Sequence, residues 1–338
     1  MNEHRRALMQ ALAAAGALGL SGGIAKAASA EPPPETTRIR LGKIPSICLA
    51  PQYVADELLR AEGFTDIEYV GTGPLGAGGL PGALALGAGD LDISMSFAAP
   101  EVVALDMGAP ITLLAGIHVG CFELFATPRI RTISELKGKT AAVLAINSAQ
   151  HIFLASIATS VGLDPQRDIH WVTHPAAEAM QKLAQGQIDA FLGFPPDAQE
   201  LRALKVGHVV LNSALDRPWS QYFCCIVAAN REFARKNPVA TKRALRAIVK
   251  GGELCATDPE LAAKAYLRQG YPTNPDYARQ ALREIPYGLW RDYNPEETVR
   301  FYALRLREAG MIKSAPEKII AQGTDWRIVN ELKREMKT

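Results

Sequence analysis

The sequence predicts an α/β protein of two lobes, in which one folding unit occurs twice. Two stretches of the same design, 86–100 and 183–196, indicate the duplication. Each is typical of a helix end, a glycine that ends the helix, a short buried strand and a loop that contains proline. Their aspartates, Asp92 and Asp189, lie 189 − 92 = 97 positions apart.

A second pair of landmarks has nearly the same spacing. The first copy begins with a strand at 38–43 and a helix that ends before Gly63, and the second with a strand at 140–146 and a helix that ends before Gly162. These glycines lie 162 − 63 = 99 positions apart. A structural duplication explains both spacings. The alternative is that any two α/β segments share such patterns of glycine and apolar residues without being related.

The remaining elements follow from apolar runs and from the positions of glycine and proline. Beyond residue 230 the pattern becomes helical: Pro238 begins a helix that runs to about Ala256, and further prolines divide the rest into short helices. Further strands are expected at 66–70, 111–117, 120–127, 170–174, 207–211 and 221–229.

The order of these elements predicts how the lobes are connected. The second unit is complete near Tyr222, yet a long apolar strand and a helical tail follow it. The simplest topology returns the chain to the first lobe, which gives two crossings and a two-stranded hinge. The sequence therefore predicts a first lobe formed by 38–124 and 224–338, and a second lobe formed by 125–223.

The N-terminal stretch predicts export. Residues 1–30 have a basic start, an apolar run of small residues and a cleavage site near Ala30, as a secretory signal does. Arg5 and Arg6 are compatible with export of the folded chain, but they leave the route open. Residues 31–37 form a Pro-rich, extended lead-in. We therefore expect a periplasmic protein.

Charge excludes two classes of partner. Without residues 1–30 the chain has 37 − 3 = 34 basic and 35 − 1 = 34 acidic side chains. This balance favours neither nucleic acid nor an anionic membrane surface as a partner. No later apolar run is long enough to span a bilayer, and we expect a monomer.

The cysteines give no metal or redox motif. No Cys-x-x-Cys spacing occurs, and an odd count leaves at least one thiol unpaired within the chain. We expect buried free thiols that pack as small hydrophobes, with disulfides as the alternative. Two of them, Cys224 and Cys225, fall in one strand and should point to opposite faces. The five are Cys48, Cys121, Cys224, Cys225 and Cys255.

Several stretches carry a resemblance to one family. They span nearly the whole chain after residue 30: 50–55, 89–93, 135–139, 187–190 and 229–233. In these the chain resembles periplasmic substrate-binding proteins of the nitrate/sulfonate/taurine ABC-importer group, which are related to the thiamine-pyrimidine biosynthesis proteins. The resemblance implies a two-lobed periplasmic binding protein (type II) with a helical C-terminal region.

The same resemblance implies a function. Such a protein closes its lobes on a small solute and delivers it to an inner-membrane ABC permease. Two alternatives stay open: an exported enzyme on the same fold, which turnover would reveal, and a ligand-sensing partner of a membrane receptor. The related biosynthetic enzymes carry a dense cysteine cluster and a cofactor-binding lysine, whereas this chain has only Cys224-Cys225 and is expected to be exported. No enzyme activity and no cofactor are therefore predicted.

Ligands of open α/β sheets bind at the carboxyl ends of the strands, which predicts a cleft between the lobes. Phe97 and Phe194, one from each lobe, could sandwich a planar ligand, or each could pack in its own core. The candidate ligand-binding residues are Ser46, Ile47, Gln52, Ser94, Ser96, Phe97, His118, Asn147, Ser148, His151, Phe194 and Tyr222.

Helix starts and histidines complete the expected site. The helix that begins at Asn147 and Ser148 offers free N–H groups to an anion, although either residue could simply cap the helix. His118 and His151 could face the cleft or be structural. His170 and His174 lie roughly 13 Å apart on one strand, too far to share a metal ion. No metal site is predicted.

The expected ligand is a small organic molecule. Apart from Lys43, the predicted cleft lacks the Arg and Lys side chains that tight anion sites recruit. We therefore expect a neutral or weakly acidic solute with a flat, partly apolar body. The stretch 71–76 formally matches a dinucleotide fingerprint, but it follows the second strand of its unit, so no nucleotide cofactor is predicted.

Overall fold

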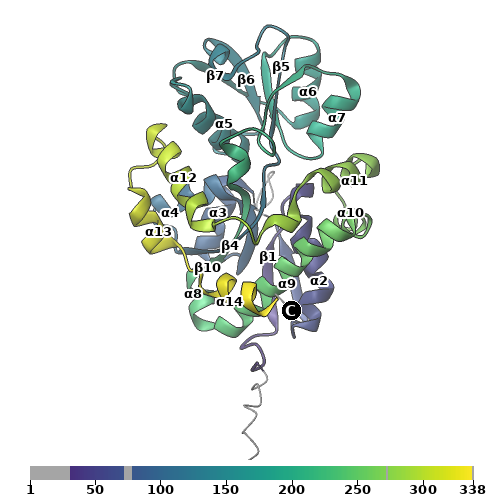
Figure 1. Cartoon of the computed structure of the whole chain (residues 1–338), viewed down its shortest axis with the longest axis vertical. Helices are drawn as coiled ribbons and strands as arrows, with labels where there is room; N and C mark the ends of the chain where they lie inside the picture. Colours follow the sequence, from purple (N-terminus) through teal and green to yellow (C-terminus); the bar gives the residue numbers. More distant parts are fainter. Residues whose placement is uncertain (1–30, 72–77, 272, 337–338) are drawn as a thin grey trace, which may run out of the picture. The chain divides into compact units, whose positions relative to one another are not determined.

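The computed structural model describes residues 31–71, 78–271 and 273–336 (Figure 1). The expected export signal and all but the first residue of the stretch 71–76 lie outside the described residues. The chain divides into residues 1–33 and a compact unit of residues 34–338, and the fold and site lie in the second unit. Within the described residues, no helix combines the length and the apolar character needed to cross a membrane.

Two five-stranded sheets form the framework of this unit. The first sheet has the order β2-β1-β3-β10-β4, with β1 Arg38–Gly42, β2 Asp66–Val70, β3 Ile93–Phe97, β4 Ile111–Val119 and β10 Phe223–Asn230. The second has the order β7-β6-β8-β5-β9, with β5 Glu123–Ala126, β6 Lys139–Val143, β7 Ile169–Thr173, β8 Ala190–Gly193 and β9 His208–Asn212.

The two sheets have the same strand order, position by position. In each, three parallel strands are followed by one antiparallel strand, β10 beside β3 and β5 beside β8. The chain passes between the sheets twice, from β4 to β5 and from β9 to β10. The predicted α/β architecture with a duplicated unit is confirmed.

The paired aspartates serve the same purpose in both copies. Asp92 exchanges hydrogen bonds with Arg40 of β1: its Oδ2 accepts from the backbone N–H at 2.7 Å, and its own N–H donates to the carbonyl at 2.9 Å. Asp189 does the same with Thr140 of β6, at 3.0 and 2.9 Å. In each sheet, an aspartate just before the third strand thus pairs with a backbone N–H and a carbonyl of the neighbouring strand.

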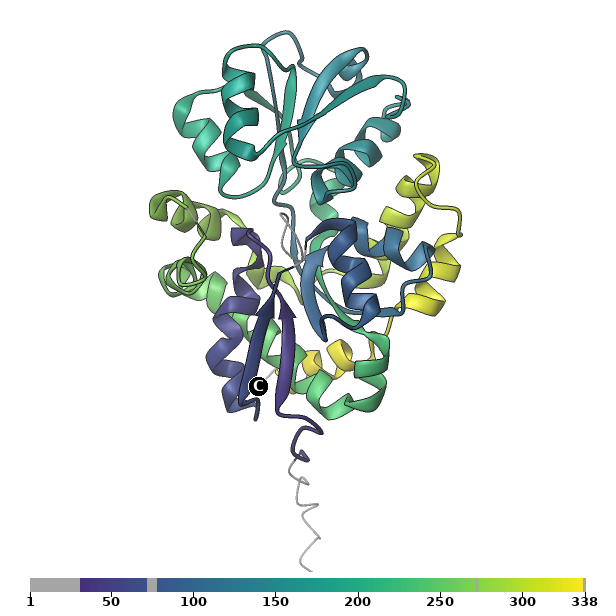
Figure 2. The same ribbon diagram turned by 180° about the vertical axis from the view of Figure 1, so that it is seen from behind.

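Helices of each unit cover its sheet. Figure 2 shows α2 beside the strands β1 and β2. The helices of the first unit are η1 Ile47–Leu49, α2 Ala50–Ala61, α3 Gly79–Ala88 and α4 Ala98–Asp106. Those of the second are η2 Ile133–Leu136, α5 Ala149–Ser160, α6 Ala176–Ala184, α7 Asp197–Leu204 and η3 Trp219–Gln221.

The C-terminal region is helical, as predicted, and packs on elements of both units. Here α9 packs on α2, while α12 packs on α4 and α5 (Figure 1). Proline begins α9 to α13 because its fixed φ suits a first helical position. The elements are α8 Arg231–Lys236, α9 Pro238–Thr257, α10 Pro259–Leu267, α11 Pro275–Glu284, η4 Tyr287–Leu289, α12 Pro295–Glu308, α13 Pro316–Gly323 and α14 Arg327–Glu335.

Candidate functional site

A cavity of about 370 Å³ lies at the carboxyl ends of strands from both sheets. Its lining comes from the segments after β1, β3, β6 and β8, from the starts of α3 and α6, and from α10, α11 and the segment that links them. The main lining residues are Ile44, Pro45, Phe97, Leu144, Ser148, Ala149, Gln150, Met180, Phe194, Pro196, Asp197, Glu200, Tyr266, Tyr271, Thr273, Asn274 and Tyr277. The size and partly apolar lining suit a small organic ligand.

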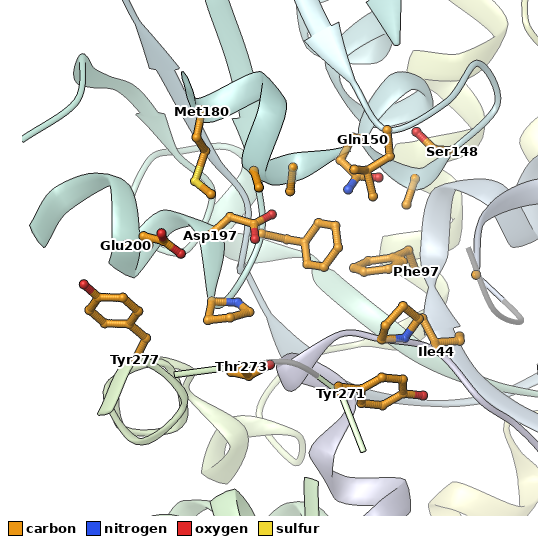
Figure 3. Close-up of a pocket in the computed structure, with 18 of the residues that line it drawn as sticks. Ile44, Phe97, Ser148, Gln150, Met180, Asp197, Glu200, Tyr271, Thr273 and Tyr277 are labelled. Atoms are coloured by element: carbon orange, nitrogen blue, oxygen red, sulfur yellow. The ribbon is translucent and has the colours of Figure 1, made fainter. Parts of the chain in front are cut away.

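The start of α5 forms one polar side of this cavity (Figure 3). Ser148 caps the helix, with its hydroxyl accepting from the N–H of His151 at 3.3 Å. Gln150 is only 2 % exposed, and its buried amide nitrogen has no hydrogen-bond partner among the described residues. A buried amide without a partner costs free energy, so a ligand with a hydrogen-bond acceptor at this position would be stabilised.

Two carboxyl groups at the start of α7 form the opposite side, where Asp197 and Glu200 lie near Tyr277 (Figure 3). Burial raises the pKa of Asp197 to about 7, and the charge of Glu200 adds to this shift. The described lining residues include no Lys or Arg. The ammonium of Lys43 lies 5.5 Å from the ring centre of Tyr271, which lines the cavity.

Aromatic rings form much of the remaining wall. Phe97 and Phe194 contact each other, with ring centres 5.9 Å apart and planes inclined by 59°. Phe122 completes a cluster of three rings, with its ring centre 5.1 Å from that of Phe97 and 6.3 Å from that of Phe194. Tyr266 and Tyr271, 5.1 Å apart, line the cavity from the C-terminal region.

Comparison with known proteins places the chain in a family. Residues 32–267 match the model of the NMT1-like family. The chain belongs to the NMT1-like family. A search of curated protein sequences found no match.

Solved structures share the fold of this NMT1-like protein. The periplasmic nitrate-binding protein NrtA from Synechocystis PCC 6803 is 14% identical, with a TM-score of 0.75 over 90% of each chain. The alkanesulfonate-binding protein SsuA from Xanthomonas axonopodis pv. citri, bound to MOPS, is 17% identical, with a TM-score of 0.66 over 86% of this chain and 99% of that one. The predicted periplasmic-binding-protein fold is confirmed, and these neighbours include nitrate- and sulfonate-binding proteins of the kind that the sequence resembles.

A further neighbour resembles the enzyme alternative. A cysteine-to-serine variant of DszB in complex with biphenyl-2-sulfinic acid is 16% identical, with a TM-score of 0.55 over 88% of this chain and 99% of that one. Most neighbours are binding proteins, yet the same fold also occurs in an enzyme.

The structure brings only part of the predicted site of this NMT1-like protein to the cavity. Phe97, Ser148 and Phe194 line it. The two phenylalanines contact each other at an angle. The other predicted residues are outside its lining: Ser46, Ile47, Gln52, Ser94, Ser96, His118, Asn147, His151 and Tyr222.

Several of these residues have structural partners instead. Gln52 joins β1 to β3: its amide donates to the carbonyl of Gly42 at 2.6 Å, and its oxygen accepts from the N–H of Met95 at 3.2 Å. The hydroxyl of Ser96 donates to Glu101. Each side chain satisfies a buried group of its own lobe.

The aromatic candidates are also held by neighbours. The ring of Tyr222 stacks on Phe301 at 3.9 Å. His151 accepts a hydrogen bond from the N–H of Asn147 at 3.2 Å, and its ring packs against Trp171 at 4.7 Å. His118 and Ser46 belong to a different cluster, with the cysteines.

Sequence reasoning missed Gln150, Asp197, Glu200 and the tyrosines of the C-terminal region. The available signal was the dense spacing of Tyr266, Tyr271 and Tyr277 around Pro272 and Pro275. Nothing in that spacing indicates which face of the molecule the segment reaches.

Proposed function

We propose that this protein is the solute-binding component of an ABC importer. In the periplasm it closes two lobes, 38–124 with 224–338 and 125–223, on a small organic solute and delivers it to an inner-membrane permease. The two passages of chain between the sheets act as the hinge. One observation carries the proposal: one cavity is lined at the carboxyl ends of strands from both sheets, and the buried amide nitrogen of Gln150 in its lining has no hydrogen-bond partner among the described residues.

The cavity supports a specific solute chemistry. The N–H end of α5 and the unpaired amide of Gln150 favour a hydrogen-bond acceptor at one side of the solute. Asp197 and Glu200 favour N–H donors or a positive charge at the other. The aromatic wall favours a flat body. We therefore propose a flat, amine-bearing solute rather than a weakly acidic one, because two carboxyl groups line the cavity.

The first experiment is native mass spectrometry of the freshly purified full chain, followed by calorimetric titration with the compound that co-purifies. Gln150→Met and Asp197→Asn should each weaken its binding by roughly tenfold or more, about 1.4 kcal/mol, because each removes a hydrogen bond that the buried solute needs. Gln181→Met, an exposed change on α6 outside the lining, is the matched control.

The outcomes separate the alternatives. Equal affinity of the unaltered chain, Gln150→Met and Asp197→Asn would show that the solute binds elsewhere. Chemical conversion of the compound during incubation would favour the exported enzyme on the same fold, in line with the DszB-like neighbour.

A further inference from the structure

Four cysteines and one histidine meet at a single buried place. They come from four segments of the chain, so their proximity is a product of the fold. None is more than 6 % exposed. They are Cys48 in η1, His118 in β4, Cys121 in the passage from β4 to β5, and Cys224 and Cys225 in β10. This thiol cluster corrects the expectation that Cys224 and Cys225 point to opposite faces: their sulfurs lie 3.9 Å apart, because the strand is irregular there.

The cluster lies next to the cavity but is not part of its lining. In the ladder of the first sheet, Cys225 is opposite Phe97 of β3 on one side and His118 of β4 on the other. Residues directly opposite in antiparallel strands point to the same face. Cys225 therefore shares a face with Phe97, which lines the cavity, whereas the pairing of Cys225 with His118 falls at the irregular part of the ladder.

The distances suit the coordination of one ion. The ligand atoms of Cys48, His118 and Cys225 all lie within 4.8 Å of one another, and so do those of Cys121, Cys224 and Cys225. Ligand atoms around a tetrahedral zinc ion with thiolates lie about 3.8 Å apart. Cys225 belongs to both sets, so a single ion beside it can reach the others.

The imidazole of His118 has the orientation of a metal ligand. Its Nδ1 faces the carbonyl oxygens of Gly120 at 3.0 Å and Val119 at 3.3 Å, and because carbonyls only accept, Nδ1 carries the proton. In a neutral ring Nε2 then has a free lone pair. That atom is buried and has no hydrogen-bond partner among the described residues. A backbone carbonyl on one ring nitrogen and a metal on the other is the usual pattern of ligating histidines.

We propose that the thiol cluster binds one thiophilic cation, Zn²⁺ or Cu⁺. Sulfur and imidazole ligands select such ions over Mg²⁺ and Ca²⁺, which prefer oxygen. Binding displaces the protons of the coordinating thiols into solvent. Three of its ligands are Nε2 of His118 and the sulfurs of Cys48 and Cys225, which belong to one set. The fourth ligand is the sulfur of Cys121 or of Cys224, since the ligand atoms of both lie within 4.8 Å of that of Cys225.

The test uses the full chain purified anaerobically with reductant and freed of metals. We expect one ion per chain by native mass spectrometry after addition of Zn²⁺ or Cu⁺, and competition between the two identifies the preferred one. Co²⁺, used as a probe, should give intense thiolate charge-transfer absorption and the visible bands of tetrahedral coordination, and Zn²⁺ should abolish both.

Variants locate the site. Cys48→Ser, Cys225→Ser and His118→Gln should each lower metal affinity by at least about tenfold. Cys255→Ser, a change at a buried thiol of α9 outside the cluster, should leave affinity unchanged. If circular dichroism shows that Cys225→Ser is unfolded, the other two variants decide the question.

Three outcomes would overturn the proposal. One is the absence of bound ion under all three metals. Another is equal metal affinity of His118→Gln, Cys48→Ser and Cys255→Ser. The third is a disulfide between Cys121 and Cys224, whose sulfurs lie 2.9 Å apart, in chain alkylated as the cells are opened, since it would remove a ligand.

Discussion

The two copies of the unit share a topology but differ at the aspartate that joins their strands. Both aspartates accept the backbone N–H of the neighbouring strand. Asp92 also binds the guanidinium of Arg40 at 2.6 Å, and its side chain is only 9 % exposed. Asp189 has only Arg129 at 3.6 Å and is 20 % exposed. Both copies thus have a carboxylate that accepts the backbone N–H of the neighbouring strand, whereas the ion pair of that carboxylate differs between them.

A second difference concerns the helices that follow the third strands. Each has an acid in its first turn, Glu101 in α4 and the partly exposed Asp197 in α7, and burial raises the pKa of both to about 7. Glu101 is enclosed in its lobe beneath Ser96, while Asp197 lines the cavity. The same place in the unit therefore holds a structural acid in one copy and a candidate binding group in the other.

The largest expected effect separates the two aspartates. Asp92→Ala should lower the free energy of unfolding by about 3 kcal/mol, because it leaves a buried N–H and the Arg40 guanidinium without their partner. Asp189→Ala should cost about 1 kcal/mol, because it removes a backbone hydrogen bond and a mostly solvent-screened contact. Urea unfolding of both variants measures the difference, and equal losses would contradict the comparison.

The next largest effect concerns how the free energy of unfolding depends on pH through the two acids. A carboxyl whose pKa is raised on folding holds its proton more tightly in the folded chain, so stability is lost as pH rises from the unfolded value of 4.5 to about 7 for Glu101. Glu101→Gln should remove this loss and stabilise the protein at pH 8 by up to roughly 3 kcal/mol. Thermal unfolding of the unaltered chain and of Glu101→Gln from pH 4 to pH 8 tests this prediction. If stability falls with pH equally in both, the raised pKa does not belong to Glu101.

Asp197→Asn should raise stability at pH 8 in the same direction, because the pKa of Asp197 is also about 7. Only this variant should also weaken solute binding, since Glu101 does not line the cavity. Calorimetric titration of both variants with the co-purified compound distinguishes them. A similar loss of affinity in both would mean that the change acts through the lobe rather than through contact with the solute.

The fold could be predicted well because local signals mark it. Glycine ends the helices and proline begins them, as at Gly89 and Pro238. The spacing between Asp92 and Asp189 exposed the duplication because both copies need the same strand contact. The start of α5 at the cavity followed from the rule for parallel strands.

The site could be predicted only in part, because it is built from loops and from the C-terminal region. The segment with Tyr271 has no periodic pattern that tells which face it reaches. The thiol cluster was hidden for a similar reason: Cys48 and Cys225 are far apart in sequence and have no ligand spacing. All five cysteines are buried free thiols, as predicted, but four gather at one place rather than packing separately.

The smallest expected effect tests how alike the copies are. Gly89 and Gly186 end the equivalent helices α3 and α6 with φ of 87° and 67°, a left-handed backbone that side chains disfavour. An added Cβ would meet only the side-chain amide of Asn230 at 3.9 Å in the first case and nothing within 4 Å in the second. Gly89→Ala and Gly186→Ala should therefore cost the same, about 1 kcal/mol, from backbone strain alone.

The matched controls are Gly89→Asn and Gly186→Asn, which should cost less, because asparagine tolerates the left-handed conformation better than alanine. Urea unfolding resolves differences of this size. A much larger loss for Gly89→Ala than for Gly186→Ala would show that the first turn depends on its packing against Asn230, whose amide also donates to the carbonyls of Leu86 and Gly87 at 2.9 and 3.1 Å. The two copies would then differ in how their helix ends are held, and not only in their ion pairs.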